Sequence, residues 1–351
     1  MKVLVTGGAG YIGSLLTRRL LAARHDVVVL DRLLFGEEPL RELAEATGYR
    51  LVIGDVRDRD MVDHLLHDRD AVIHLAAIVG EAACNADPRL AVETNLTATQ
   101  RLAEATAAAG IARFVFASTC SVYGAGGVAR LHEESPLAPT ELYAETRVNA
   151  ERSLAGAIRH GLRPTVLRFG TVYGVSPRTR FDLVVNLLTA RALRDHAVSI
   201  FGGEQWRPFV HVDDVARALH ESLDADLDRV GDQTLNVGDN RENYQMKQLG
   251  PVLAQEVPGT RVTVVPEVVD QRSYHVMFDK IERLLGFHAG FNVARGVREV
   301  SEAIRSGAIP DPNDRRLVNH RAAPAAQPAA TKAEGAGPGV VPARTPARPA
   351  G

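Results

Sequence analysis

The stretch that decides the fold is Val3–Gly13, VLVTGGAGYIG, in which an apolar strand runs into three glycines spaced by two residues. Gly7 permits a tight turn, and Gly10 lets the main chain approach phosphate oxygens. Gly13 allows the following helix to pack closely on the strand, so that its first N–H groups point at an anion. The stretch therefore predicts a dinucleotide-binding unit.

The residues that follow complete this pattern. An apolar-periodic helix comes next, and a second strand, Val27–Leu30, ends in Asp31. A carboxylate close to 20 residues beyond the glycines can accept both adenosine ribose hydroxyls and would repel a 2′-phosphate, which favours NAD over NADP. Arg32 stands beside it and could offset that repulsion, so NADP stays open as an alternative.

Composition limits the other classes of function. The chain has 351 residues, 45% of them apolar, so it can bury a large core. Its net charge is −2, which gives no indication of a general surface for nucleic acid or anionic membranes. Cys84 and Cys120 are too few and too far apart for a disulfide framework or a metal site. With a strand from residue 2 and no apolar run of about 20 residues, we expect a cytoplasmic protein without a signal peptide.

Strand and helix patterns alternate up to about residue 170, which predicts an α/β fold with a doubly wound parallel (Rossmann) sheet. Strands are expected at 2–6, 27–31, 50–53, 71–76, 113–118 and 164–169, with helices that include 88–109 and 140–160. We expect an NAD-binding domain over 1–175, to which later segments return, and a smaller α/β lobe, mainly for the substrate, over 176–315. The Ala/Pro-rich segment 322–351 cannot offset its ordering entropy and is expected to be disordered.

Two segments place reactive side chains at the carboxyl ends of strands. Phe114–Gly124, FVFASTCSVYG, runs into a hydroxyl-rich loop, and Tyr143 and Arg147 lie four residues apart on one helical face. A tyrosine with its ordinary pKa near 10 is a poor base at neutral pH. A cation one turn away and a bound nicotinamide ring would lower that pKa, and Thr119 could bond the same substrate oxygen.

Together with Asp31, these segments resemble the extended short-chain dehydrogenase/reductases. The ordered motifs are TGGAGYIG, Gly54-Asp55-Val56, His74-Leu75-Ala76-Ala77, Asn95, STCSVYG and a YxxxR helix. Within that superfamily they are similar to the nucleotide-sugar epimerase/dehydratase group typified by UDP-glucose 4-epimerase, over about residues 1–308. The resemblance implies an NAD-dependent enzyme that acts on a nucleotide-diphosphate sugar.

The resemblance also implies a set of site residues. The implied catalytic residues are Tyr143, Arg147 and Thr119. The implied cofactor-binding residues are Gly7, Gly10, Tyr11, Ile12, Gly13, Asp31, Arg32, Asp55, Val56, Leu75, Ala76, Ala77, Tyr143 and Arg147. The implied substrate-binding residues are Thr119, Ser121, Thr171, Arg207 and Arg272.

One position departs from the family, which has Lys where this chain has Arg147. A guanidinium keeps the charge, but its planar fork is bulkier than an ammonium. The chain has only four lysines against 37 arginines, so Arg147 can reflect composition, with activity retained. A slow or specialised site, or a cofactor-binding protein with little turnover, remains a possible interpretation.

The residues after Thr119 narrow the chemistry. Family dehydratases carry Asp-Glu there because loss of water needs an extra acid and base, and decarboxylases commonly keep the Glu, so this position disfavours dehydration more strongly than decarboxylation. This chain has Cys120 and Ser121. The sequence therefore favours 4-epimerisation through a transient keto-sugar with Tyr143 as base, and reduction of a nucleotide-keto-sugar by NAD(P)H is the alternative.

The remaining expectations concern the substrate and the assembly. Arg207 lies in a segment, RPFVHVDD, that resembles a family motif whose Arg pairs with the nucleotide, and Arg272 matches a second family arginine aimed at the diphosphate. His211 and Asp213 are expected to fix the local loop. The alanine-rich helices 88–109 and 140–160 match a pair that forms a four-helix bundle in the family, which predicts a homodimer.

Overall fold

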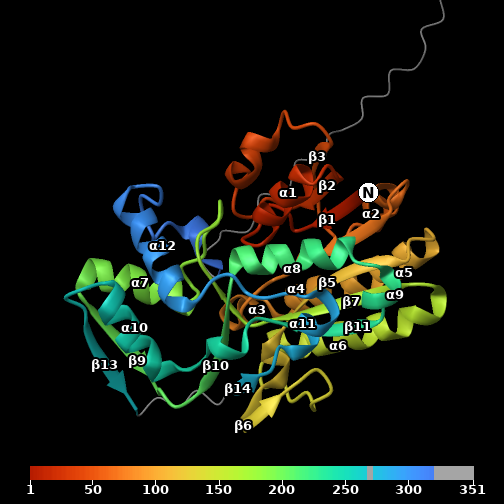
Figure 1. Cartoon of the computed structure of the whole chain (residues 1–351). Coiled ribbons are helices and arrows are strands. Elements are labelled where there is room, and N and C mark those ends of the chain that lie inside the picture. The colour runs from red at the N-terminus through yellow and green to blue at the C-terminus, as the bar shows by residue number, and fades with distance from the viewer. Residues whose placement is uncertain (267–271, 320–351) are drawn as a thin grey trace, which may run out of the picture.

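The computed structural model describes residues 1–266 and 272–319 (Figure 1). Its centre is a parallel sheet with the strand order β11-β7-β5-β4-β1-β2-β3. The strands are β1 (Lys2–Thr6), β2 (Asp26–Asp31), β3 (Tyr49–Ile53), β4 (Ala71–His74), β5 (Arg113–Thr119), β7 (Arg163–Phe169) and β11 (Gln233–Val237). This confirms the predicted doubly wound α/β fold. The predicted disordered tail, 322–351, lies outside the described residues.

Helices cover both faces of this sheet because successive strand side chains point to opposite sides. On one face, Leu16 and Leu219 pack with Val3 and Val5 of β1, and on the other Leu102 packs with residues that include Leu4. The helices of the first face include α1 (Gly13–Ala22), α8 (Val212–Asp224) and α11 (Asp279–Leu285). Those of the second are α2 (Arg59–Leu66), α5 (Ala98–Ala108) and α6 (Leu142–Ala157).

The strand order reverses between β1 and β4. The chain moves outward from β1 to β2 and β3, and then returns to the other side of β1 to build β4, β5, β7 and β11. The loops that leave β1 and β4 therefore diverge and open a crevice at the carboxyl ends of the strands. In doubly wound sheets this switch point is where ligands bind.

A smaller lobe lies beside the carboxyl edge of the sheet (Figure 1). It has its own core, which includes Leu188, Ile200, Phe209 and Leu253. Its helices are α7 (Val184–Asp195), α10 (Leu249–Glu256) and α12 (Val293–Arg305), and its strands are β8 (Thr171–Tyr173), β9 (Ala197–Phe201), β10 (Trp206–His211), β12 (Asn243–Gln245) and β13 (Arg261–Val265). β6 (Ala125–Leu131) pairs with β14 (Ser273–Val276).

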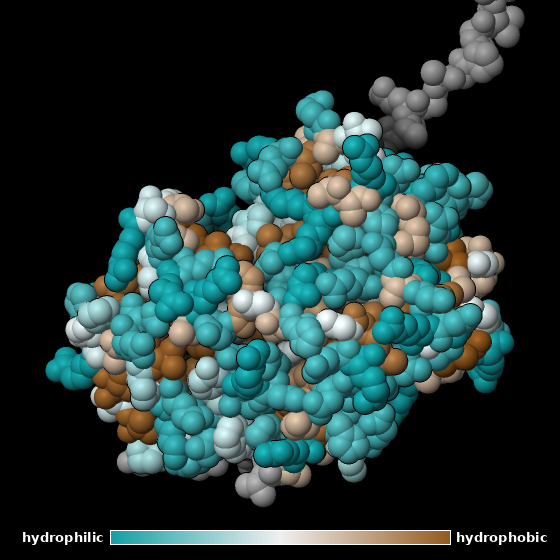
Figure 2. Space-filling view, in the orientation of Figure 1, coloured by the Kyte–Doolittle hydropathy of each residue, from teal (hydrophilic) through white to brown (hydrophobic). Residues whose placement is uncertain are grey.

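The remaining short helices are α3 (Glu81–Ala86), α4 (Pro88–Val92) and α9 (Leu227–Val230). The expected single helix at 88–109 is built from α4, one π-helical turn over Glu93–Thr97, and α5. Within the described residues, no helix is long and apolar enough to cross a membrane. The face shown in Figure 2 is largely hydrophilic, with hydrophobic side chains scattered over it.

Candidate functional site

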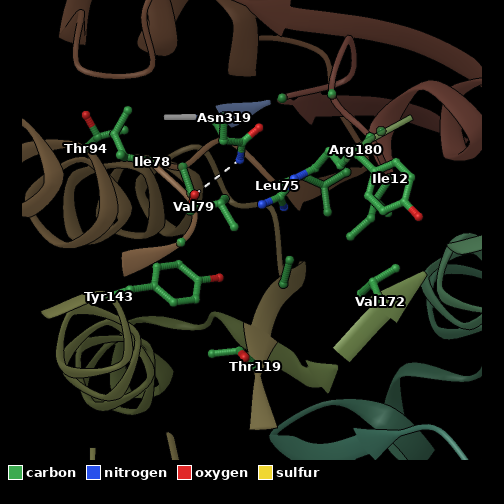
Figure 3. A pocket seen from close by; sticks show the side chains of 18 of the residues that line it. Ile12, Leu75, Ile78, Val79, Thr94, Thr119, Tyr143, Val172, Arg180 and Asn319 are labelled. Carbon is green, nitrogen blue, oxygen red and sulfur yellow. Dashed lines mark hydrogen bonds between the residues drawn. The ribbon is translucent and has the colours of Figure 1, made fainter. Parts of the chain in front are cut away.

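A cavity of about 360 Å³ opens at the switch point between β1 and β4 (Figure 3). Every predicted site residue except Arg207 lines this cavity. The predicted residues that line it are Gly7, Gly10, Tyr11, Ile12, Gly13, Asp31, Arg32, Asp55, Val56, Leu75, Ala76, Ala77, Thr119, Ser121, Tyr143, Arg147, Thr171 and Arg272. Segments that are far apart in the sequence thus share one site.

Each of the three loop positions is occupied by glycine for a different structural reason. Gly7 has a φ of +78°, and a Cβ there would lie 2.7 Å from the backbone nitrogen of Ala76. A Cβ on Gly13 would lie 2.2 Å from the carbonyl oxygen of Gly7. A Cβ on Gly10 would meet only that same carbonyl, at 3.2 Å, and Gly10 lines the cavity. Gly7 and Gly13 are therefore needed by the fold, and Gly10 keeps space open for a ligand.

Asp31 ends β2 and lines the cavity beside the glycine loop. Its carboxylate accepts hydrogen bonds from the backbone N–H groups of Ala9 (3.0 Å) and Leu33 (2.8 Å). Burial raises the pKa of Asp31, and these two donors oppose that rise. The nearby Arg32 instead forms an ion pair with Asp55 at 3.2 Å. The guanidinium that could have favoured a 2′-phosphate is therefore engaged elsewhere.

A second arginine near Asp31, Arg178, was not foreseen from the sequence. Its guanidinium lies 3.6 Å from the centre of the Phe35 ring, and its Nε donates to the carbonyl of Arg316 at 3.1 Å. Burial lowers the pKa of Arg178 to about 9, with help from the charge of Arg180. Its Nη2 has no hydrogen-bond partner among the described residues, although it is shielded from solvent. Such an atom is costly unless a ligand accepts from it.

Buried polar residues fix the loop after β4. The imidazole of His74 is hydrogen-bonded to Thr6 Oγ1 (2.6 Å) and Thr99 Oγ1 (2.9 Å), which joins β4 to β1 and α5. Burial, followed by the charge of Arg147, lowers the pKa of His74 to about 3, so its ring is neutral. Asn95, in the π-helical turn, bonds both backbone groups of Ile78 at 2.8 and 2.9 Å. These contacts hold the cavity wall in place.

Tyr143 and Thr119 flank the cavity from different elements, α6 and the end of β5 (Figure 3). Thr119 Oγ1 donates to Ser121 Oγ at 3.0 Å. Arg147 follows one turn after Tyr143 and is only 2% exposed. Its guanidinium carbon lies 5.4 Å from the ring centres of both Tyr143 and Phe116. The three predicted catalytic residues, Tyr143, Arg147 and Thr119, therefore all line the same cavity.

The positive charge of Arg147 is buried without a carboxylate in ion-pair range among residues 1–266 and 272–319. Its Nε is also without a hydrogen bond within that part of the chain. An unpaired buried charge is strongly unfavourable, so this side chain is suited to an anionic or hydroxyl-rich ligand. Together with the space at Gly10 and the carboxylate of Asp31, it fits a bound NAD.

Cys120 and Ser121 occupy the positions where a second acid pair would stand. Cys120 is buried, donates to the carbonyl of Arg168 at 3.3 Å, and does not line the cavity. Burial raises the pKa of its thiol. The preceding Ser118 is bonded to Glu151 at 2.5 Å, and Glu151 is paired with Arg168 at 2.7 Å. The described loop thus offers hydroxyls to the cavity and no carboxyl group.

The two arginines predicted to bind substrate differ in their position relative to the cavity. Arg272 lines the cavity and donates to Glu141 at 3.1 Å, and Thr171 lines it from β8. Arg207 lies outside the lining, over the ring of Tyr274, and donates to the backbone carbonyl of Arg272. Arg207 therefore contacts the backbone of Arg272 and does not line the cavity. Its direct contact with substrate stays a prediction.

The predicted loop residues have structural partners. His211 is paired with Glu299 at 2.6 Å, and Asp213 with Arg19 at 2.7 Å. Trp206 stacks on His275, with ring centres 4.8 Å apart.

Arg180 and Asn319 are among the other lining residues that sequence reasoning missed. Arg180, paired with Asp182 at 2.7 Å, reaches into the middle of the cavity from the segment before α7 (Figure 3). Asn319 donates to the carbonyl of Val79 at 3.2 Å, so the end of the described chain borders the same cavity. Arg178 and Arg180 both belong to the segment Pro177–Arg180, and this pair of arginines is the local signal that could have pointed to them.

The fold and site define a dinucleotide-binding α/β protein with a tyrosine, an arginine and a hydroxyl loop at the switch point. The chain belongs to the NAD dependent epimerase/dehydratase family, whose profile matches residues 3–238. It is therefore a member of a family of NAD-dependent enzymes, as the sequence predicted.

Its relatives differ in the reaction named for them. The chain is 31% identical over 319 residues to a dTDP-glucose 4,6-dehydratase of Streptomyces niveus, covering 87% of this chain and 93% of that protein. It is 33% identical over 235 residues to a UDP-glucose 4-epimerase of Streptomyces lividans, covering 62% and 70%. The crystal structure of a UDP-glucuronic acid 4-epimerase from Bacillus cereus with UDP-glucuronic acid and NAD is similar, with a TM-score of 0.78, 27% identity and coverage of 87% and 99%.

Proposed function

We propose that this chain is an NAD-dependent epimerase of nucleotide-diphosphate sugars that acts at C4. The observation that carries the proposal is the wall formed by Tyr143, Arg147 and Thr119 in the cavity that the glycine loop also lines. The loop after Thr119 brings Cys120 into the core and only the Ser121 hydroxyl into the cavity. That arrangement supports hydride and proton chemistry at one carbon, and disfavours the loss of water.

In the proposed mechanism, the deprotonated phenol (phenolate) of Tyr143 takes the proton of the sugar 4-hydroxyl while Thr119 bonds the same oxygen. NAD, which the glycine loop and Asp31 would hold, would supply the hydride acceptor for C4 and, in the reverse direction, the hydride donor. The proton returns from Tyr143 to the oxygen after the transient keto-sugar has turned its other face. Arg147 stabilises the phenolate form of Tyr143 that must exist before proton transfer, because it is a fixed cation one turn away in a buried site.

The proposed substrate anchors are Arg272, with Thr171 and Ser121 nearer the sugar. Arg272 lines the cavity at its Glu141 side, and a guanidinium suits the diphosphate because it can bond two oxygens at once. Arg207 would then position Arg272 through its backbone carbonyl. A tethered diphosphate leaves the sugar free to rotate, which epimerisation requires and simple reduction does not.

The experiment uses the full chain, purified without added cofactor. We expect NAD to remain bound after gel filtration, and UDP-glucose to give UDP-galactose when the products are separated by chromatography. UDP-glucuronic acid and dTDP-glucose are tested in parallel, because these substrates are named for the similar proteins. Cofactor-free protein that consumes NADPH with a keto-sugar would favour the reductase alternative. A 4-keto-6-deoxy product would contradict the proposal, and bound NAD without turnover would favour a binding protein.

A further inference from the structure

A second cluster of ligand-type side chains lies near the amino end of β2, at the opposite end of the strands from the cavity. His25 stands between α1 and the start of β2, and His220 and Asp224 lie four residues apart on one face of α8. The cavity, in contrast, lies at the carboxyl ends of β1 and β2. α1 and α8 pack against each other, so the three side chains meet although they are distant in the sequence (Figure 1).

The ligand atoms converge at distances that suit a metal ion. Nε2 of His25 lies 3.2 Å from Oδ1 of Asp224, and Nε2 of His220 lies 3.1 Å from Oδ2 of the same carboxylate. One ligand atom from each residue can be chosen so that all lie within 4.8 Å of one another. Zinc–nitrogen bonds of about 2.0–2.1 Å in a tetrahedral site place neighbouring ligand atoms about 3.3 Å apart. Both imidazole–carboxylate distances are therefore close to this geometry.

A second observation comes from His220. Its Nε2 atom is shielded from solvent and makes no hydrogen bond within the described part of the chain, although Oδ2 of Asp224 lies 3.1 Å away. A buried imidazole nitrogen without a partner is unfavourable. A cation between the two imidazoles and the carboxylate would use this atom, since a neutral imidazole presents a lone pair to a metal.

We propose that His25, His220 and Asp224 form a binding site for one divalent transition-metal ion of the zinc type. Two imidazoles and one carboxylate favour zinc over calcium or magnesium, which prefer oxygen ligands. With three protein ligands, the fourth position is left to water. The ion ties the end of α8 to the junction of α1 and β2. The site is remote from the cavity, so its role is in stability rather than in turnover.

The surrounding charges set limits on the affinity. His25 is one of the two imidazole ligands, and its side chain is only 8% exposed. The nitrogen of Met1 lies 3.3 Å from its Nδ1. Arg113 bonds the carbonyls of Ser222 and Ala225 and interacts with Asp224, so it is a cation that opposes the metal. We therefore expect binding that is specific but weaker than that of a closed four-ligand site.

The test measures zinc binding by the full chain, freed of metal with a chelator and carrying no histidine tag. We expect one Zn²⁺ per chain, a melting temperature raised by roughly 5 °C at hundredfold excess over the Kd, and a four-coordinate visible spectrum with Co²⁺. His220→Gln and Asp224→Asn should each weaken zinc binding at least tenfold. The control variant His160→Gln, at an exposed histidine in the 3-10 turn after α6, should leave zinc binding unchanged.

The two ligand variants are chosen because His220 and Asp224 are partly exposed, at 19% and 47% of the side chain, so the metal-free fold should survive the changes. Metal-free melting curves of the variants and the wild type check this. Absence of stoichiometric zinc binding by the wild type would overturn the proposal. So would equal zinc affinity in the wild type and both ligand variants.

Discussion

Substitution of the loop glycines separates what the fold needs from what the cofactor needs. In Gly13→Ala the new Cβ would lie 2.2 Å from the Gly7 carbonyl oxygen and 2.7 Å from the Cα of Gly8. These are backbone atoms that cannot rotate away, so the loop must shift. Overpacking of this kind costs about 1–3 kcal/mol of the free energy of unfolding. We therefore expect Gly13→Ala to lose both stability and NAD binding.

Gly10→Ala should behave differently. Its Cβ would meet only the Gly7 carbonyl oxygen at 3.2 Å, and the φ of Gly10 is not positive. The free energy of unfolding should change by about 1 kcal/mol or less. The methyl group, however, enters the space that a diphosphate would fill. We expect NAD affinity to fall at least tenfold, which corresponds to about 1.4 kcal/mol.

The assay pairs NAD titration by calorimetry with urea unfolding of the cofactor-free chain. Gly156→Ala is the matched control, because Gly156 is in α6 and a Cβ there would have nothing within 4 Å. This control should gain about 0.5–1 kcal/mol of stability and keep NAD affinity. The reasoning is refuted if Gly10→Ala binds NAD as tightly as the wild type, or if Gly13→Ala keeps both properties.

Three further predictions concern the side chains around the cavity. Tyr143→Phe should lower epimerisation at least hundredfold while NAD stays bound; product chromatography tests this, and near-normal turnover would exclude Tyr143 as the base. Arg147→Lys should keep turnover within about tenfold, since the charge stays beside the phenol, whereas Arg147→Met should lose about a hundredfold; equal rates in the two variants would contradict this electrostatic role. His74 has a folded pKa of about 3 and an unfolded pKa near 6.5, so below about pH 6 the unfolded chain alone takes up its proton, and stability should fall by up to about 1.4 kcal/mol per pH unit. Urea unfolding at pH 7, 5.5 and 4.5 should show a shallower loss in His74→Asn, and an unchanged slope would show that other groups cause it.

The sheet and most of the cavity could be predicted because their signals are local. The strand, turn and helix of Val3–Gly13 are specified within eleven residues, and Asp31 is positioned by the length of one βαβ unit. Parallel strands then bring Thr119 to the same edge, and α6 places Tyr143 beside it. Each inference depended on one element and one topological rule, so no long-range packing had to be known.

The residues that were missed depend on tertiary contacts without a local pattern. Arg178 and Arg180 are two of 37 arginines, and their burial follows from contacts with Phe35 and Asp182. Asn319 reaches the cavity through a hydrogen bond to a residue 240 positions earlier. Arg207 is the opposite case. Its motif could be recognised in the sequence, but its side chain contacts the backbone of Arg272 and does not line the cavity.

Two of the buried guanidinium groups that line the cavity, those of Arg147 and Arg178, link cofactor binding to the stability of the fold. Each has a shielded nitrogen without a hydrogen bond inside residues 1–266 and 272–319, and both line the cavity that also contains the glycine loop. Burying such groups costs free energy of folding, and only a ligand with acceptor oxygens returns it. We expect a cofactor that accepts hydrogen bonds from both groups to be held tightly, since its loss would leave two desolvated cations without a partner. Tight retention is what epimerisation requires, because the same cofactor must take a hydride and give it back before the sugar leaves.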